Sequence, residues 1–243
     1  MEGGRCVGAA CGDLGRVDLK HDVRTGRDDP SAEAAGDAEG TRRQTWQASR
    51  ADETRTRVLD AVVECLAEMP YTDVSAARIS ERSGVSRGGV QYHYPTRQEL
   101  FLATIDHLYE RRLKAYAERL KAIPAGVDMI DYLIDSQWRY FHERDFQAYM
   151  ELVLAARAEP DLRTAMGPDY RAFLQQWYDV SLTAFGWDNA LPDVRRIGNV
   201  IQYTMEGMAY GELANQLEPT EVEDTLAYLK EMLRVGLRVS QGT

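Results

Sequence analysis

A run of polar and flat side chains between Arg87 and Arg97 holds the residues of this chain best suited to bind another molecule through hydrogen bonds. Arginine can donate two hydrogen bonds to O6 and N7 of guanine, and glutamine can pair in the same way with adenine. Arg87 and Gln91 are four residues apart, so on a helix they share one face, while Val90 and Tyr94 share another that packs inward. The spacing predicts a helix that presents donors to the edges of DNA bases.

Two adjacent glycines, Gly88 and Gly89, lie in this helix and each weakens it by about 1 kcal/mol relative to alanine. The major groove of DNA is about 12 Å wide, and a glycine allows the helix backbone to approach the groove wall closely. We therefore expect the glycines to serve proximity to DNA rather than helix stability.

The elements that position these side chains begin with hydroxyl residues. Ser75 caps a short helix predicted over residues 75–82, and Gly84 follows it where a left-handed residue is favoured. Ser86 begins the next helix directly after this turn. A further helix, predicted over residues 53–68, precedes both. A helix, a tight turn with glycine and a second helix have the form of a helix-turn-helix, whose second helix enters the major groove.

Phosphate contacts are expected beside the base contacts, because hydroxyls, backbone N–H groups and guanidinium groups at helix N-termini can hold phosphates. Each polar residue alone could be an ordinary solvated side chain, but their clustering behind a tight turn favours DNA binding. The predicted DNA-binding residues are Ser75, Ser86, Arg87, Gly88, Gly89, Gln91, Tyr92, His93 and Arg97.

This stretch carries a family resemblance. Residues 55–105, with the segment YTDVSAARISERSGVSRGGVQYHYPTRQEL, resemble the DNA-binding domain of the TetR family of transcriptional regulators. The resemblance implies that Ser75, Gly84, Val85 and Ser86 keep their family places and that His93 matches the family's histidine.

Three positions depart from the family pattern. Tyr94 replaces a core phenylalanine, and Arg97 stands where the family usually has a phosphate-binding lysine. Gln91 stands where the family usually has a DNA-contacting tyrosine, and we expect Tyr92 to take over its phosphate contact.

The rest of the chain predicts helices only. Thr96 caps a long helix that continues to about residue 120, and Pro124 and Gly126 mark a boundary. Later helices are predicted over residues 127–143, 145–158, 161–185, 193–216 and 221–239. The predicted fold is all-α, with a three-helix DNA-binding domain in residues 51–118 and a ligand-binding and dimerisation bundle in residues 119–243.

Residues 1–50 are polar and lack a helical or strand period, so we predict a disordered tail. There are two alternatives. This segment could be a basic arm that enters a DNA minor groove, with Arg42, Arg43 and Arg50, or it could result from a misplaced start codon.

The resemblance implies that the bundle binds a small-molecule effector and pairs with a second subunit through its last two helices. A pocket for an apolar or aromatic molecule is predicted from aromatic and polar residues beyond what aliphatic packing needs, although a helical aromatic stripe is more often core. The predicted ligand-binding residues are Gln137, Trp138, Phe141, Tyr149, Trp177, Tyr178, Tyr203 and Glu206, with Arg139, Asn199 and Gln202 as further polar candidates.

Two apolar stripes on the last two helices predict the dimer contact. The alternative interpretation is that these stripes are buried within their own subunit. Gly207 and Gly211, four apart, would permit a close helix crossing. The stripes consist of Ile197, Val200, Ile201, Thr204 and Met208 on one helix and Leu226, Leu229, Leu233 and Leu237 on the next.

Composition excludes several other classes. The net charge of -10 argues against a protein that coats nucleic acid indiscriminately, and no catalytic constellation, metal-ligand spacing, cofactor motif or membrane span is visible. Three scattered cysteines favour the cytoplasm. The sequence thus predicts a regulator, most simply a repressor, that binds a double-stranded operator as a homodimer. A helical enzyme and an interaction module that no longer binds DNA remain the alternatives, and the operator and effector are left open.

Overall fold

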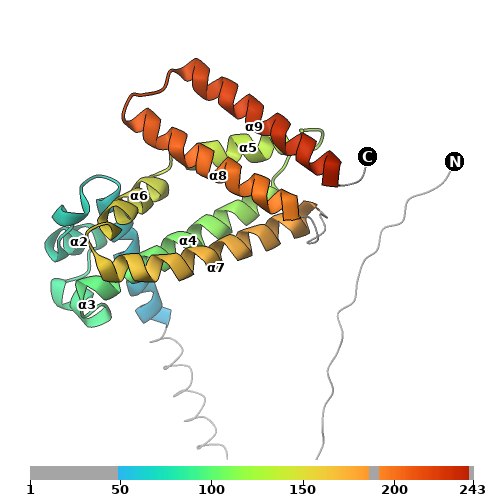
Figure 1. The fold of residues 1–243 in the computed structure, drawn as a ribbon. Helices are drawn as coiled ribbons and strands as arrows, with labels where there is room; N and C mark the ends of the chain where they lie inside the picture. Colours follow the sequence, from blue (N-terminus) through green and yellow to red (C-terminus); the bar gives the residue numbers. More distant parts are fainter. Residues whose placement is uncertain (1–48, 186–191, 241–243) are drawn as a thin grey trace, which may run out of the picture. The chain divides into compact units, whose positions relative to one another are not determined.

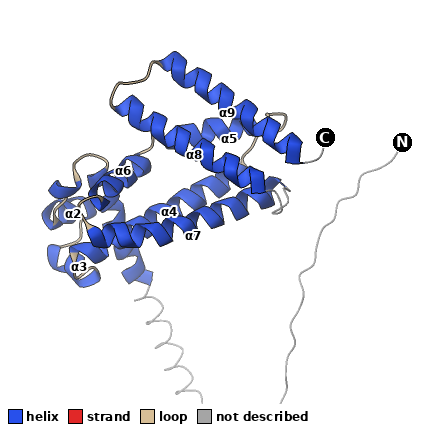
Figure 2. Ribbon diagram, viewed as in Figure 1, coloured by secondary structure: helices blue, strands red, loops and turns tan. Residues whose placement is uncertain are grey.

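The computed structural model describes residues 49–185 and 192–240. These residues form helices joined by short loops, with no strand among them (Figure 2). The predicted all-α fold is confirmed. In the same residues, no helix is both long and apolar enough to cross a membrane, and no cluster of His, Cys, Asp and Glu could hold a metal ion.

The first three helices and the start of the fourth form the N-terminal part of the fold (Figure 1). Residues 49–66 are helical, which extends the predicted helix by four residues at its start. A single 3-10 turn, η1 (Tyr71–Asp73), follows and was not expected from the sequence. The remaining elements are α2 (Ala76–Ser83), α3 (Arg87–His93) and α4 (Arg97–Lys121).

The predicted caps explain where these helices begin. The Ser75 hydroxyl accepts a hydrogen bond from the Arg78 N–H, and the Ser86 hydroxyl accepts one from Gly89. Gly84 ends α2 with a φ of 67°, in the left-handed region that glycine tolerates best. Thr96 and Glu99 form a complete capping box at the start of α4, which fixes its direction.

The C-terminal helices follow the predicted order with small shifts at their ends. They are α5 (Met129–Tyr140), α6 (Arg144–Ala156), α7 (Pro160–Phe185), α8 (Pro192–Leu213) and α9 (Pro219–Ser240). Helix α4 packs along α7 and against α6, α8 packs on α9, and α5 lies against α9 (Figure 1).

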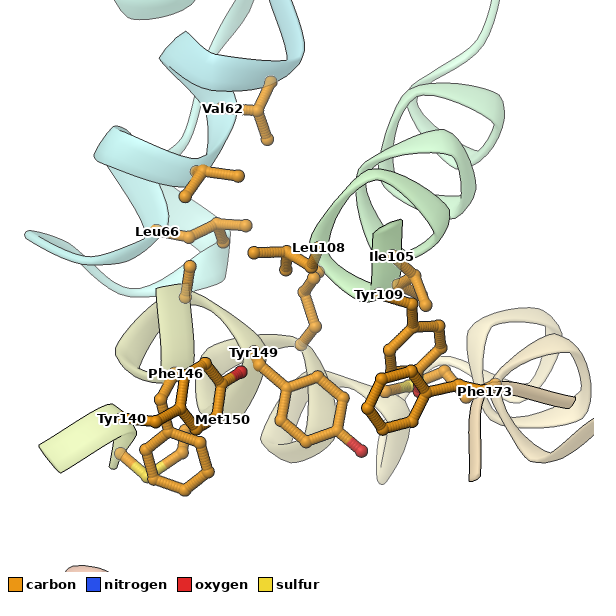
Figure 3. Close-up of a cluster of buried hydrophobic side chains, with 14 of the residues drawn as sticks. Val62, Leu66, Ile105, Leu108, Tyr109, Tyr140, Phe146, Tyr149, Met150 and Phe173 are labelled. Atoms are coloured by element: carbon orange, nitrogen blue, oxygen red, sulfur yellow. The ribbon is translucent and has the colours of Figure 1, made fainter. Parts of the chain in front are cut away.

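One hydrophobic core continues from the N-terminal helices into the later ones. Figure 3 shows Val62 and Leu66 of the first helix near Leu108 of α4, with Phe146 of α6 and Phe173 of α7 in the same cluster. Because α4 contributes to both ends of this core, it connects the predicted DNA-binding helices to the bundle. The domain boundary at residue 118 stays a prediction.

The apolar stripe of α9 faces the protein's own interior. Leu229, Leu233 and Leu237 are all buried within this single chain, so burial in their own subunit, the alternative to the dimer contact, holds for them. The close crossing of α8 and α9 lies at Gly236, where a side chain would collide with Ile197. It does not lie at Gly207, whose side-chain position is open, or at Gly211, where a side chain would instead meet Leu217 of the connecting loop.

Candidate nucleic-acid interface and bundle cavity

Helix α3 presents its polar residues outward, as its spacing predicts. Val90 is only 4% exposed and packs in the core, with Tyr94 half-buried beside it. Arg87 and Gln91 are exposed at the edge of this packed face. Both side chains are therefore accessible for contacts with base edges in a DNA major groove.

A groove joins this face to the starts of α2 and α4. Its volume is about 580 Å³, and Ser75, Arg87, Gln91 and Arg97 line it together with Thr96. Four of the predicted contact residues, from three different helices, are thus brought to one surface. We name it the α3 groove.

The two glycines have different surroundings. A side chain at Gly88 would meet no atom within 4 Å, so nothing inside the protein requires glycine there. At Gly89 a Cβ would lie 2.9 Å from the Val85 side chain and 3.3 Å from the Ser86 hydroxyl. Close packing of the turn on α3 therefore accounts for Gly89, and close approach to DNA stays a prediction for Gly88.

Arg97 has a structural role that the sequence did not reveal. Its guanidinium donates to the carbonyl oxygens of Val74 at 2.5 Å and Tyr71 at 2.6 Å. It also lies 4.5 Å from the ring centres of Tyr71 and Phe101, a cation–π geometry. Arg97 thus ties η1 and the start of α2 to α4, so any phosphate contact must be made by a side chain already held in place.

Two aromatic residues close the C-terminal end of α3. Tyr92 is 83% exposed, and its ring meets the half-buried His93 edge-on at 5.2 Å between ring centres. Tyr92 does not line the α3 groove, and its exposed phenol is accessible to a partner. Ser86 is occupied by its cap to Gly89, which leaves it as a positioning residue.

The bundle contains a cavity of about 70 Å³ between α4, α5, α7, α8 and α9. Three of the predicted ligand-binding residues line it: Gln137, Trp177 and Tyr178. The rest of the lining is mostly apolar and consists of Tyr116, Leu133, Ile134, Ser181, Leu182, Gly198, Ile201, Gln202 and Leu233.

The other predicted ligand residues are not gathered at this cavity. Phe141 and Tyr149 are buried in the core, and Trp138 packs edge-on against His142. Tyr203 is 57% exposed on the outer face of α8, and Glu206 does not line the cavity. The predicted residues lie on α5 or directly after it and on α6, α7 and α8, whereas the cavity is lined by α4, α5, α7, α8 and α9. The sequence could not say which side of each helix faces the cavity.

Arg112 is the residue that the sequence analysis missed. It is 5% exposed, and its Nη2 donates to the Gln202 Oε1 at 3.2 Å. Gln202 Oε1 also accepts from Gln137 Nε2 at 3.0 Å. The signal was present, because Arg112 stands four residues from both Leu108 and Tyr116 on the apolar face of α4.

This arrangement of α2, a left-handed glycine turn and an outward-facing α3 has the form of a helix-turn-helix, the motif of many DNA-binding domains. Residues 58–104 match the family model described as bacterial regulatory proteins, tetR family. This segment is therefore that of the TetR family, as its resemblance implied.

Relatives with curated descriptions match over about half of this chain. The HTH-type transcriptional regulator CymR of Pseudomonas putida is 35% identical over 117 residues, which are 48% of this chain and 58% of CymR. An uncharacterized HTH-type transcriptional regulator of Mycobacterium tuberculosis (strain ATCC 25618 / H37Rv) is 34% identical over 120 residues, 49% of this chain and 62% of the relative. The chain therefore matches about three fifths of the length of these relatives.

Solved structures show the same fold over a longer stretch. A TetR-family regulator from Streptomyces coelicolor has a TM-score of 0.58 at 17% identity, covering 79% of this chain and 83% of that protein. A transcriptional regulator from Rhodococcus sp. Rha1 has a TM-score of 0.57 at 21% identity, covering 75% and 96%. At this identity the likeness concerns the fold alone.

Proposed function

We propose that this protein is a ligand-responsive transcriptional repressor that binds a palindromic operator as a homodimer and is released by a small apolar or aromatic molecule. The observation that carries the proposal is the exposed pair Arg87 and Gln91 on a helix that Ser86 caps behind the left-handed Gly84. A regulator is favoured over an enzyme because the matched relatives are named as transcriptional regulators. Such a protein would act in the cytoplasm.

The proposed dimer would form through the outer face of α8 and α9. Helix-turn-helix dimers read two half-sites about one turn of DNA apart, so each subunit supplies one recognition helix. Large apolar side chains remain exposed on these two helices although their inner faces are buried. They are Val200, Tyr203 and Leu213 on α8 and Tyr228 and Val235 on α9.

Helix α4 supports coupling between effector and DNA. It begins beside the α3 groove at Thr96 and Arg97, and Tyr116 near its far end lines the bundle cavity. A helix of 25 residues is about 38 Å long, so it spans the distance between the two sites. Enlargement of the cavity by a ligand would move α4, and with it the recognition helix.

The test is binding to DNA that flanks the gene for this protein, measured over a range of salt concentrations. We expect specific, steeply salt-dependent binding, because phosphate contacts release counterions. Equal affinity for unrelated DNA would overturn the proposal.

Induction is tested separately by reciprocity. If a ligand weakens operator binding by about 5- to 150-fold, operator DNA must weaken ligand binding by the same factor. Tryptophan fluorescence titrations with and without operator measure this, and equal ligand affinity in both would exclude induction while leaving DNA binding intact.

A further inference from the structure

A buried positive charge in the bundle lacks a negative partner. The Arg112 guanidinium is flanked by the rings of Tyr140 and Phe173, 4.4 and 5.0 Å away. Its only hydrogen-bond partner in the described part of the chain is the neutral Gln202, and its buried Nε has none. Buried charges are normally paired, so an anion bound beside Arg112 would stabilise its buried charge.

The nearest candidate for a counter-charge within the protein is a poor one. Glu206 on α8 is attracted by Arg112, yet the two make no ion pair within 4.0 Å in the described residues. Burial raises the pKa of Glu206 and so disfavours its charged form. Among the described residues, Arg112 therefore has no ion-pair partner.

One side chain, that of Gln202, connects the bundle cavity with the Arg112 guanidinium. Gln202 lines the cavity and holds its Oε1 against both Arg112 and Gln137, the position that a carboxylate oxygen would take. The remaining wall offers flat apolar surface from Tyr116, Trp177 and Leu233. Burial raises the pKa of Tyr116 to about 12, so its phenol does not place a negative charge near the site at neutral pH.

From this arrangement we infer that the effector is a small monocarboxylic acid with an apolar, flat body, whose carboxylate displaces Gln202 and pairs with Arg112. This inference rests on the proposed function, since it names the effector of that same regulator. An arginine and a carboxylate can form two parallel charge-assisted hydrogen bonds, which a neutral amide cannot replace.

The size of the cavity links binding to conformation. A cavity that holds benzene measures about 150 Å³, which is larger than the 70 Å³ found here. The acid must therefore bind a form in which the cavity has widened. Arg112 and Tyr116 both belong to α4, so binding of the acid would also shift α4, the helix that begins at the α3 groove.

The experiment compares matched flat acids and amides by calorimetry on the full chain: benzoate with benzamide, and phenylacetate with phenylacetamide. We expect at least one acid to bind about tenfold or more tightly than its amide, the difference between a charge-assisted and a neutral hydrogen bond. Arg112→Gln should remove this preference, and Arg112→Lys should keep part of it. Arg119→Gln, which removes an α4 arginine that pairs with Glu143 instead, is the control and should change nothing.

A second variant keeps the test valid if Arg112→Gln does not fold. Gln202→Ala removes the side chain that competes for Arg112, so it should strengthen acid binding and leave amide binding unchanged. The inference is overturned if no acid binds more tightly than its amide, or if the preference survives Arg112→Gln. Operator binding is measured on the same preparations without acid, so its retention in either case leaves the proposed function standing.

Discussion

Arg87 and Gln91 share the exposed face of α3, and both line the α3 groove. We expect Arg87→Ala and Gln91→Ala each to cost about 1–3 kcal/mol of operator affinity and to relax preference at particular base pairs. Competition binding against all single-base operator variants measures this, with Gln216→Ala, exposed between α8 and α9, as the control. Uniform weakening on every sequence would refute base readout.

Arg97 combines two tasks, so its substitutions should separate them. Arg97→Ala should lower Tm, because it removes two carbonyl contacts and the stacking on Tyr71. If one phosphate contact is lost, the slope of the logarithm of the binding constant against the logarithm of the salt concentration should become shallower by about 0.9. Arg97→Lys should lower Tm as well but retain the salt slope, because the charge remains. A normal Tm for both variants would contradict the structural role.

The two glycines provide a matched pair of substitutions. Gly88→Ala should raise the free energy of unfolding by about 0.5–1 kcal/mol, since its side-chain position is open and alanine favours the helix. Gly89→Ala should lower it by about 1–3 kcal/mol through crowding against Val85. Urea unfolding measures both. If Gly88→Ala leaves operator affinity unchanged, close approach of the backbone to DNA at this position is wrong.

Residue-level features were predictable where their cause is local. Ser75, Gly84 and Ser86 act within a few residues of the chain, so their caps and turn follow from the sequence. The role of Arg97 was not predictable, because its carbonyl partners lie 23 and 26 residues away. The cavity residues depend on five helices meeting, which no local pattern encodes.

At the scale of elements, an ion-pair cluster holds the N-terminal helices against α6. Glu68, just after the first helix, binds Arg82 of α2 and Arg144 of α6. The hydrogen bond from Arg82, and then that from Arg144, lowers the pKa of Glu68 to about 2 from an ordinary value of 4.5. The folded state therefore binds protons more weakly than the unfolded chain at this carboxyl.

This cluster predicts a specific acid sensitivity. The stabilisation by Glu68 is fully present above pH 4.5 and is lost as the pH falls toward about 2. Glu68→Gln should lower Tm at pH 7, and the difference from the wild type should shrink over that range. Glu81→Gln, exposed on α2, is the control. A Tm difference that does not change with pH would show that the ion pairs contribute nothing.

The positions of the helices were largely predictable, whereas their buried faces were not. Pro160, Pro192 and Pro219 begin α7, α8 and α9 near the predicted points, because proline suits the first turn of a helix. The stripe of Leu229 and Leu233 was assigned to a second subunit, yet it packs inside this one. An apolar stripe shows that a face is buried and not by which chain.

For the whole molecule, the exposed face of α8 and α9 predicts the assembly. The double variant Val200→Glu and Tyr203→Glu should yield folded monomers, because these residues are 50% and 57% exposed in the single chain. Leu229→Glu, at a position only 3% exposed, should instead unfold the protein. Light scattering and circular dichroism distinguish the two results.

Val127→Glu, at an exposed valine in the loop before α5, is the matched control and should remain dimeric. A dimer that survives the double substitution would place the interface elsewhere.

The backbone of Tyr71 in η1 makes contacts in two directions. Its N–H donates to the Glu151 carboxylate of α6 at 3.1 Å, while its carbonyl oxygen accepts from Arg97 of α4. With the ion pairs of Glu68, the N-terminal helices are therefore fastened to the bundle along two separate helices. A body attached at two places is carried without turning when both attachments shift equally, and it tilts only when they shift by different amounts. The orientation of α3 thus reports the relative displacement of α4 and α6, and a uniform swelling of the bundle leaves it unchanged.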